Sequence, residues 1–265
     1  MEKTLVLAPA VAGLFVVLTC TTARAQFADS VVAYTPGSGV STNYQHTDVV
    51  LGAPATFIGY QNADPFNPPY ATNDIVGIGT GGSLTLAFNK PIQNNPLDPY
   101  GLDFIIFGHA GFIEDFDTAT AVDGSLFTGG TANVRVSVSA DGSSFFTLNP
   151  ALAPAVDSLY PTDSSGSPFI PVNPSLTASD FAGKDLAGIR SLYNGSAGGA
   201  GFDLGWAVDG NNQSVDLPSI SYVRLEDLSG TAFIDAVSAV PEPSALSLAL
   251  LSGAAVVRRK RRTNA

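Results

Sequence analysis

Acidic side chains are the groups in this chain whose type and spacing could do chemistry. The chain carries 23 Asp and Glu against 12 Lys and Arg. Carboxylate and loop carbonyl oxygens are the ligands that Ca²⁺ prefers. The candidate ligands are Asp115 and Asp117 in an acidic segment, Asp203 three residues before a tryptophan, and Asp235 within an apolar alternation. The pattern therefore makes Ca²⁺ the candidate cofactor. The alternative, that these acids are solvated loop residues and turn caps, stays open.

Side chains for nucleophilic or zinc catalysis are scarce. His46 and His109 are the two histidines, and the chain holds neither an HExxH pair nor a Gly-x-Ser-x-Gly elbow. Paired carboxylates could serve a glycosidase, but pairs arise by chance among so many acids. We therefore expect a protein that is not an enzyme, with no catalytic residue. A secreted hydrolase acting on glycosides or polysaccharides is the alternative.

Aromatic side chains offer a second kind of chemistry, which is stacking on sugar rings. Tyr60, Tyr70 and Tyr100 lie in segments rich in Asn, Asp and Pro. Trp206 alternates with two apolar residues, which favours a place in the core. Polysaccharide is accordingly a candidate partner alongside calcium.

Short strands must position these residues, because Gly and Pro punctuate the chain and long helical periodicity is absent. One short helical turn is expected within 180–189, and the longest loops over 59–74, 108–130 and 149–180. The expected strands are 29–34, 49–51, 83–88, 102–107, 134–138, 145–148, 202–208, 220–225 and 233–237. This spacing predicts an all-β fold with one domain, either a β-sandwich or a jelly roll.

The N-terminal segment has the pattern of a secretory signal peptide. A basic residue and an apolar run precede the A-x-A pair Ala23 and Ala25, so signal peptidase is expected to release a chain that begins at Gln26. Cys20, the one cysteine, would leave with residues 1–25. The exported domain would then have no disulfide.

The C-terminal segment 240–265 has three parts in order. Pro241, Glu242 and Pro243 come first, and the apolar run 244–257 follows. At about 1.5 Å per residue this run spans about 21 Å, which is short against about 30 Å of bilayer hydrocarbon. The chain then ends in a basic cluster that would stop transfer on the cytoplasmic side, comprising Arg258, Arg259, Lys260, Arg261 and Arg262.

This tail resembles the PEP-CTERM sorting signal of Gram-negative bacteria. The resemblance rests on Pro241, Glu242 and Pro243, the apolar helix, and the Arg-rich end. It implies recognition by an exosortase-type transpeptidase and removal of the tail. The protein would cross the inner membrane transiently and reach the cell surface or extracellular matrix, where exopolysaccharide is a candidate partner.

Residues 26–239 form the expected ectodomain, and they carry 21 of the 23 acids but five Lys and Arg. So acidic a surface repels nucleic acid. Segments such as 50–54, 81–88 and 201–209 resemble a bacterial surface β-sandwich, similar to carbohydrate-binding and discoidin-like jelly rolls. The sequence therefore predicts an exported, non-catalytic surface or matrix protein.

Overall fold

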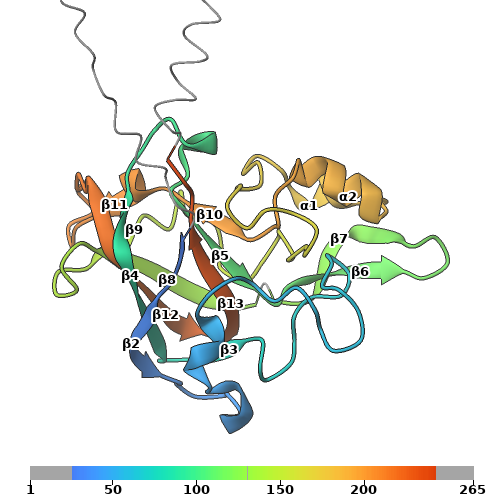
Figure 1. The fold of residues 1–265 in the computed structure, drawn as a ribbon, viewed down its shortest axis with the longest axis horizontal. Coiled ribbons are helices and arrows are strands. Elements are labelled where there is room, and N and C mark those ends of the chain that lie inside the picture. The colour runs from blue at the N-terminus through green and yellow to red at the C-terminus, as the bar shows by residue number, and fades with distance from the viewer. Residues whose placement is uncertain (1–25, 130, 243–265) are drawn as a thin grey trace, which may run out of the picture. The chain divides into compact units, whose positions relative to one another are not determined.

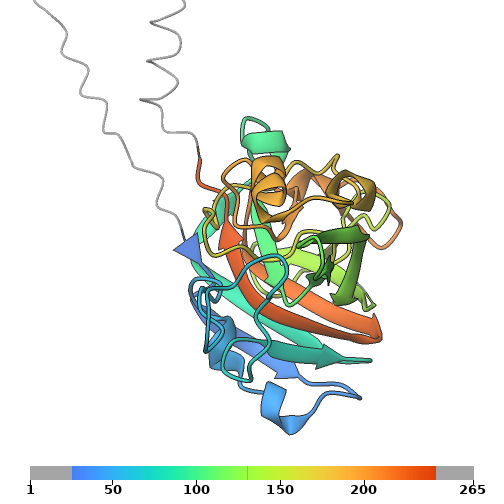
Figure 2. The same ribbon diagram turned by 90° about the vertical axis from the view of Figure 1, so that its right-hand side faces the viewer.

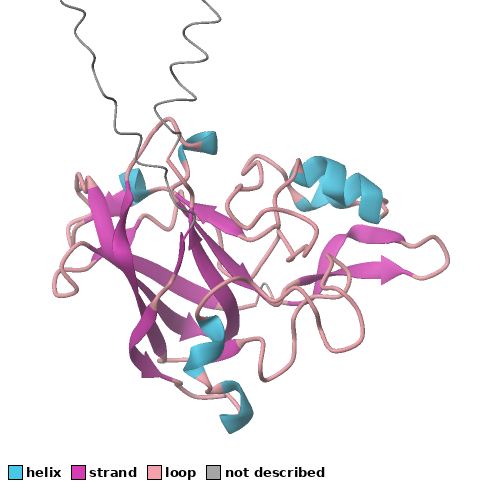
Figure 3. Cartoon of the chain, viewed as in Figure 1, coloured by secondary structure: helices cyan, strands magenta, loops and turns pink. Residues whose placement is uncertain are grey.

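The computed structural model describes residues 26–129 and 131–242, and they form a mainly β structure (Figures 1 and 3). The expected signal peptide, Pro243, the apolar run and the basic end lie outside these residues. The strands are β1 (Gln26–Phe27), β2 (Ser30–Thr35), β3 (Val76–Gly79), β4 (Ser83–Gln93), β5 (Phe104–Gly108), β6 (Gly111–Asp115), β7 (Thr120–Thr128), β8 (Asn133–Ser139), β9 (Phe146–Leu148), β10 (Ala200–Phe202), β11 (Ala207–Val208), β12 (Ser219–Ser229) and β13 (Thr231–Ala239). The α-helices are α1 (Ala178–Phe181) and α2 (Leu186–Tyr193).

Two antiparallel sheets make a sandwich-like arrangement (Figure 2). One sheet has the order β1-β13-β5-β10, with β3 also paired to β13, and the other has the order β11-β9-β8-β12-β4-β2. Gly230 alone separates β12 of one sheet from β13 of the other. Its φ of 96° suits glycine, since other residues rarely adopt that conformation. The two sheets of the sandwich are thus joined by a tight turn between β12 and β13.

Alternation along the strands explains the core between the sheets. Leu84, Leu86 and Phe88 of β4 are buried together, as their spacing predicts. All five residues of β5 are buried, because β13 and β10 cover its two edges and both of its faces are packed. The prediction of a central apolar strand at 102–107 is therefore confirmed, with β5 as that strand.

The first and last strands of the described chain pair with each other. Gln26 of β1 pairs with Ala239 of β13, and Phe27 pairs with Ser238. The first and last strands are therefore neighbours in one sheet. β13 has β1 and β3 along one edge and β5 along the other, so it is the strand with the most partners in that sheet.

A second, smaller core lies beside the sandwich. The hairpin β6–β7 and the helices α1 and α2 gather on one side of the molecule (Figure 1). Phe112 of β6, Phe181 of α1 and Tyr193 of α2 pack together at its centre and are all buried. The expected loop over 108–130 was therefore wrong, because this segment forms β6 and β7 and buries Phe112. The short helix expected within 180–189 is confirmed in part, since α1 and α2 both overlap this range and extend beyond it.

Two further expectations about strands are corrected. Residues Thr47–Val50 form a 3₁₀ helix, where a strand was expected, and only Val50 of this helix is buried. The segment 202–208 is broken after β10 by a 3₁₀ turn, because the Asp203 side chain accepts a hydrogen bond from the Gly205 N–H at 2.6 Å. The hairpin predicted at 134–148 is confirmed as β8 and β9.

Within residues 26–129 and 131–242, the structure contains no helix with both the length and the apolar character to cross a bilayer.

Candidate functional site

The candidate site is a cavity of about 230 Å³ that opens between the 59–74 loop and the base of the β6–β7 hairpin. Aromatic rings make up most of its wall, and a few polar side chains interrupt them. The lining residues are Ile58, Tyr60, Phe66, Asn67, Pro68, Tyr70, His109, Phe127 and Thr128. A mainly apolar hollow with a few convergent polar groups has the make-up of a small-molecule site.

Three of the aromatic rings are unusually accessible. Tyr60 is 65% exposed, Tyr70 is 48% exposed and Phe127 is 57% exposed. The Tyr70 carbonyl accepts a hydrogen bond of 2.9 Å from the Tyr44 hydroxyl, which ties this part of the loop to its neighbour. Scattered exposed aromatics are ordinary, but several around one hollow indicate a contact surface.

A chain of hydrogen bonds runs from the cavity into the interior. The Thr128 Oγ1 lies 2.5 Å from His109 Nε2, and His109 Nδ1 lies 2.6 Å from Asp157 Oδ2. A carboxylate accepts, so Nδ1 donates its proton to Asp157. When the ring carries this proton alone, Nε2 accepts the Thr128 hydroxyl proton. The polar wall of the cavity is therefore held by a buried acid that does not itself line it.

Asp157 is placed by the backbone around it and is 4% exposed. Its Oδ1 accepts hydrogen bonds from the His109 and Ala110 N–H groups at 2.7 and 2.8 Å, and its Oδ2 accepts one from Phe233 at 3.2 Å. A Cβ at Gly108 would lie 2.3 Å from the carboxylate, so glycine is needed there. One carboxylate thus joins the end of β5, β13 and the loop before α1.

The other wall depends on a local turn. The Asn67 side chain donates hydrogen bonds of 3.1 and 3.3 Å to the Asp64 carboxylate, which also accepts from the Phe66 N–H. This geometry presents the Asn67 amide oxygen as an acceptor. Across the cavity, Phe127 and Pro68 approach Gly111 so closely that a Cβ there would lie 2.5 and 2.8 Å from them.

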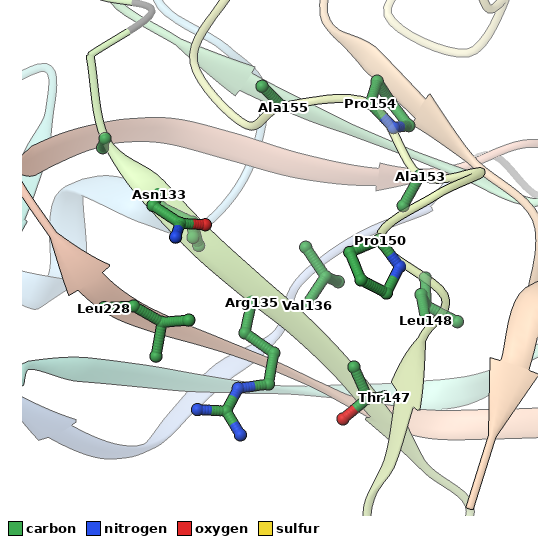
Figure 4. A pocket seen from close by; sticks show the side chains of 12 residues that line it. Asn133, Arg135, Val136, Thr147, Leu148, Pro150, Ala153, Pro154, Ala155 and Leu228 are labelled. Atoms are coloured by element: carbon green, nitrogen blue, oxygen red, sulfur yellow. The ribbon is translucent and has the colours of Figure 1, made fainter. Parts of the chain in front are cut away.

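A second cavity of about 350 Å³ lies beside β8 (Figure 4). Val136 of β8, Leu148 of β9, and Pro150 and Ala153 of the following loop face this space. β9 pairs with β8 only at Ser137 and Val138, so the space fills the part of the edge that β9 leaves uncovered. Its wall is apolar except at a few positions and has no carboxylate.

The four predicted calcium ligands occupy three different elements. Asp115 ends β6, where its Oδ1 accepts from the Asp117 N–H at 2.9 Å. Asp203 caps the 3₁₀ turn that follows β10. Asp235 of β13 is buried, and both its oxygens accept from the Ala55 N–H, at 3.0 and 3.1 Å. Burial raises the pKa of Asp235 well above its usual value.

Hydrogen bonding to the backbone thus accounts for a buried carboxyl group at Asp235. Over the described part of the chain, no cluster of three or more His, Cys, Asp or Glu is arranged to hold a metal ion. Calcium binding stays a prediction, and titration calorimetry with Ca²⁺ tests it.

A different set of acids meets at the Pro-Glu-Pro segment. Asn95 donates hydrogen bonds to Asp98 and to Glu242, and its own N–H bonds to Asp103 at 3.0 Å. Asp98 is 4% exposed, and its Oδ2 has no partner among the described residues. Burial, and then the nearby Glu242 and Asp103, raise the pKa of Asp98 to about 7. Burial likewise raises the pKa of Asp103 to about 7.

Sequence reasoning found part of the aromatic site. Tyr60 and Tyr70 line the cavity together, whereas Tyr100 lies in a separate turn at Pro99–Gly101 and Trp206 is half-buried against the main core. His109 and Thr128 were missed, because they flank a hairpin that was expected to be a loop. No local pattern in the sequence pairs them, because they lie 19 positions apart and the segment between them lacks the regular alternation of a strand.

Comparison with known protein families and with curated proteins finds no match to this chain.

Proposed function

We propose that this chain is an exported, non-catalytic protein of the cell surface or exopolysaccharide matrix, sorted through its Pro-Glu-Pro tail. The functional domain of the mature protein would be the jelly-roll-like sandwich of residues 26–239. The partners would be signal peptidase at Ala25 and an exosortase-type transpeptidase at the tail. Polysaccharide is the proposed partner at the destination.

One observation supports this proposal above others. The pairing of Gln26 with Ala239 makes the expected signal-peptide junction and the expected tail junction neighbours on one sheet. Among the described residues, the cores are built from residues between Gln26 and Val240, and Val240 lies directly before the Pro-Glu-Pro motif. Release at Gln26 and cleavage at or after Pro243 would therefore keep every described core residue in the mature protein.

Intact mass of the protein from each cell fraction of its host tests the proposal. The expected species begins at Gln26, has lost Arg258–Arg262, and is recovered with the surface or matrix. Glu242→Ala is expected to leave the uncut form in the inner membrane, because the acid between the two prolines defines the motif. The matched control is Glu226→Ala, which removes a half-buried acid whose contact with Arg135 spans 3.7 Å.

A wild-type protein that keeps its basic end in the inner membrane would overturn the proposal and make the tail an anchor. Equal processing of Glu226→Ala and wild type, with failure of Glu242→Ala alone, separates motif recognition from damage to the fold.

A polysaccharide-acting hydrolase is the second candidate, and the Asp157–His109–Thr128 array favours it. In such an enzyme the Thr128 oxygen would attack an ester carbonyl while His109 Nε2 takes the Thr128 hydroxyl proton. His109 would then pass this proton to the leaving alcohol, and water would hydrolyse the acyl group from Thr128. Glycosidase chemistry has less support, because a carboxylate pair is needed and neither cavity is lined by one. Acetate release from an acetylated glycan, absent in Thr128→Val, would establish the hydrolase.

A further inference from the structure

We propose that the 230 Å³ cavity beside His109 binds a single neutral sugar ring of a polysaccharide. The ligand class rests on the proposed matrix role, which supplies the polymer. The size, the polar groups and the charge of the cavity favour this ligand.

The size of the cavity selects one ring. Pockets for drug-sized ligands usually measure about 300–1,000 Å³, and this one measures about 230 Å³. Tyr60, Tyr70 and Phe127 present ring faces that are about half exposed or more. The apolar face of a pyranose can lie against such rings, with its hydroxyl groups turned to the rim.

The polar groups of the cavity suit a ligand that donates hydrogen bonds. When His109 carries a proton on Nδ1 alone, Thr128 donates to Nε2, and the remaining lone pairs of the Thr128 oxygen can accept from a ligand hydroxyl. The Asn67 amide nitrogen donates to Asp64, which fixes the side chain, and the Asn67 amide oxygen is a second acceptor among the lining residues. Both acceptors are held in place by second partners and require little ordering when the ligand arrives.

The charge of the cavity selects a neutral sugar. No Lys or Arg belongs to its lining, and the domain around it is strongly acidic. A uronate, sulfate or phosphate group would meet no cation there and would be repelled over a longer range. Asp64 and Asp157 lie behind the wall, and each is already hydrogen-bonded by Asn67 or His109.

Affinity electrophoresis of the full chain tests the proposal. Detergent-extracted protein is run in native gels that contain one of three neutral polymers, a glucan, a galactomannan or a xylan, or the charged polymer polygalacturonate. At least one neutral polymer is expected to retard the protein and polygalacturonate is not. Tyr60→Ala should weaken the retardation at least about fivefold through loss of a stacking face. Tyr100→Ala is the matched control, because Tyr100 is 53% exposed but lies outside the cavity.

Two further variants keep the test decisive if Tyr60→Ala disturbs the loop. Tyr60→Phe retains the ring and should bind nearly as well as wild type, and Thr128→Val removes the acceptor at constant shape and should weaken binding. Retardation by no neutral polymer, stronger retardation by polygalacturonate, or equal loss in Tyr100→Ala would each overturn the proposal. Localisation of the protein is read out separately, so failure of glycan binding and failure of sorting are distinguishable.

Discussion

Asp157 does more than any other single side chain to hold the candidate site together. It satisfies the N–H groups of His109, Ala110 and Phe233 and also orients the His109 ring, which lies 4.6 Å from the Phe233 ring. Its own φ of 54° falls in the left-handed region, which Asp tolerates better than most residues. A carboxylate with four partners in a buried place is costly to remove, because each donor loses its acceptor.

Asp157→Ala is expected to lower the free energy of unfolding by about 3 kcal/mol or more, since buried donors without acceptors each cost about 1–3 kcal/mol. Asp157→Asn should cost less, because Asn keeps one acceptor oxygen and tolerates the same φ. Urea denaturation measures both changes. Asp123→Ala serves as control, because Asp123 is exposed and accepts from the Ser125 N–H alone at 2.9 Å. A loss no larger than that of the control would contradict this account of Asp157.

At the scale of elements, the β6–β7 hairpin and α1 form a unit that carries one wall of the cavity. Gly124 of β7 is the point of closest approach, because a Cβ there would lie 2.0 Å from the Ala178 carbonyl oxygen of α1. Its φ of 78° adds a second reason for glycine.

Gly124→Ala is therefore expected to separate α1 from β7 and to lower the free energy of unfolding by about 2–4 kcal/mol, in the range of overpacked cores and strained turns. Hydrogen exchange should increase in β6, β7, α1 and α2 and stay slow in β5 and β13. Gly81→Ala is the matched control, because Gly81 has a similar φ of 75° but its Cβ would meet no atom within 4 Å. Equal exchange in the two variants would show that backbone strain, and not the contact with α1, sets the effect.

The sandwich was largely predictable from the sequence, and the smaller core was not. Alternation of Leu84, Leu86 and Phe88 predicts β4, because one face of that strand is wholly buried. The β6–β7 segment offers no such alternation, since Ile113, Val122 and Phe127 are exposed and only Phe112 and Ala121 are fully buried. The polar part of the site was likewise not predictable from the sequence, because its residues meet through tertiary contacts between segments about 20 to 50 residues apart.

At the scale of the whole molecule, the acids around Glu242 link stability to pH. The pKa values of Asp98 and Asp103 are raised to about 7 in the folded protein, mainly by burial. Between about pH 4 and pH 7 the folded state therefore holds protons that the unfolded chain releases. The stability that these groups confer is complete below about pH 4 and is lost as the pH rises through 7.

The free energy of unfolding is accordingly expected to fall between about pH 4 and pH 7, by at most about 1.4 kcal/mol per pH unit for each group. Asp98→Asn should flatten the slope, because the amide does not titrate. Asp123→Asn, at an exposed acid whose pKa Ser125 lowers, should leave it unchanged. Urea denaturation at successive pH values gives the slope, and a stability that is constant or rises from pH 4 to pH 7 would refute this linkage.

The position of β13 also determines how the protein would respond to mechanical load. Its C-terminal end leads toward Glu242, and Phe233 near its other end packs on His109 beside the cavity. Tension between Glu242, at the C-terminal end of the described chain, and a bound glycan would thus run along β13, whose hydrogen bonds lie across that direction and would share the force. Pulling at Gln26 would instead peel the two-residue β1 first. Single-molecule stretching should therefore record a higher rupture force when the chain is pulled at Glu242 than when it is pulled at Gln26.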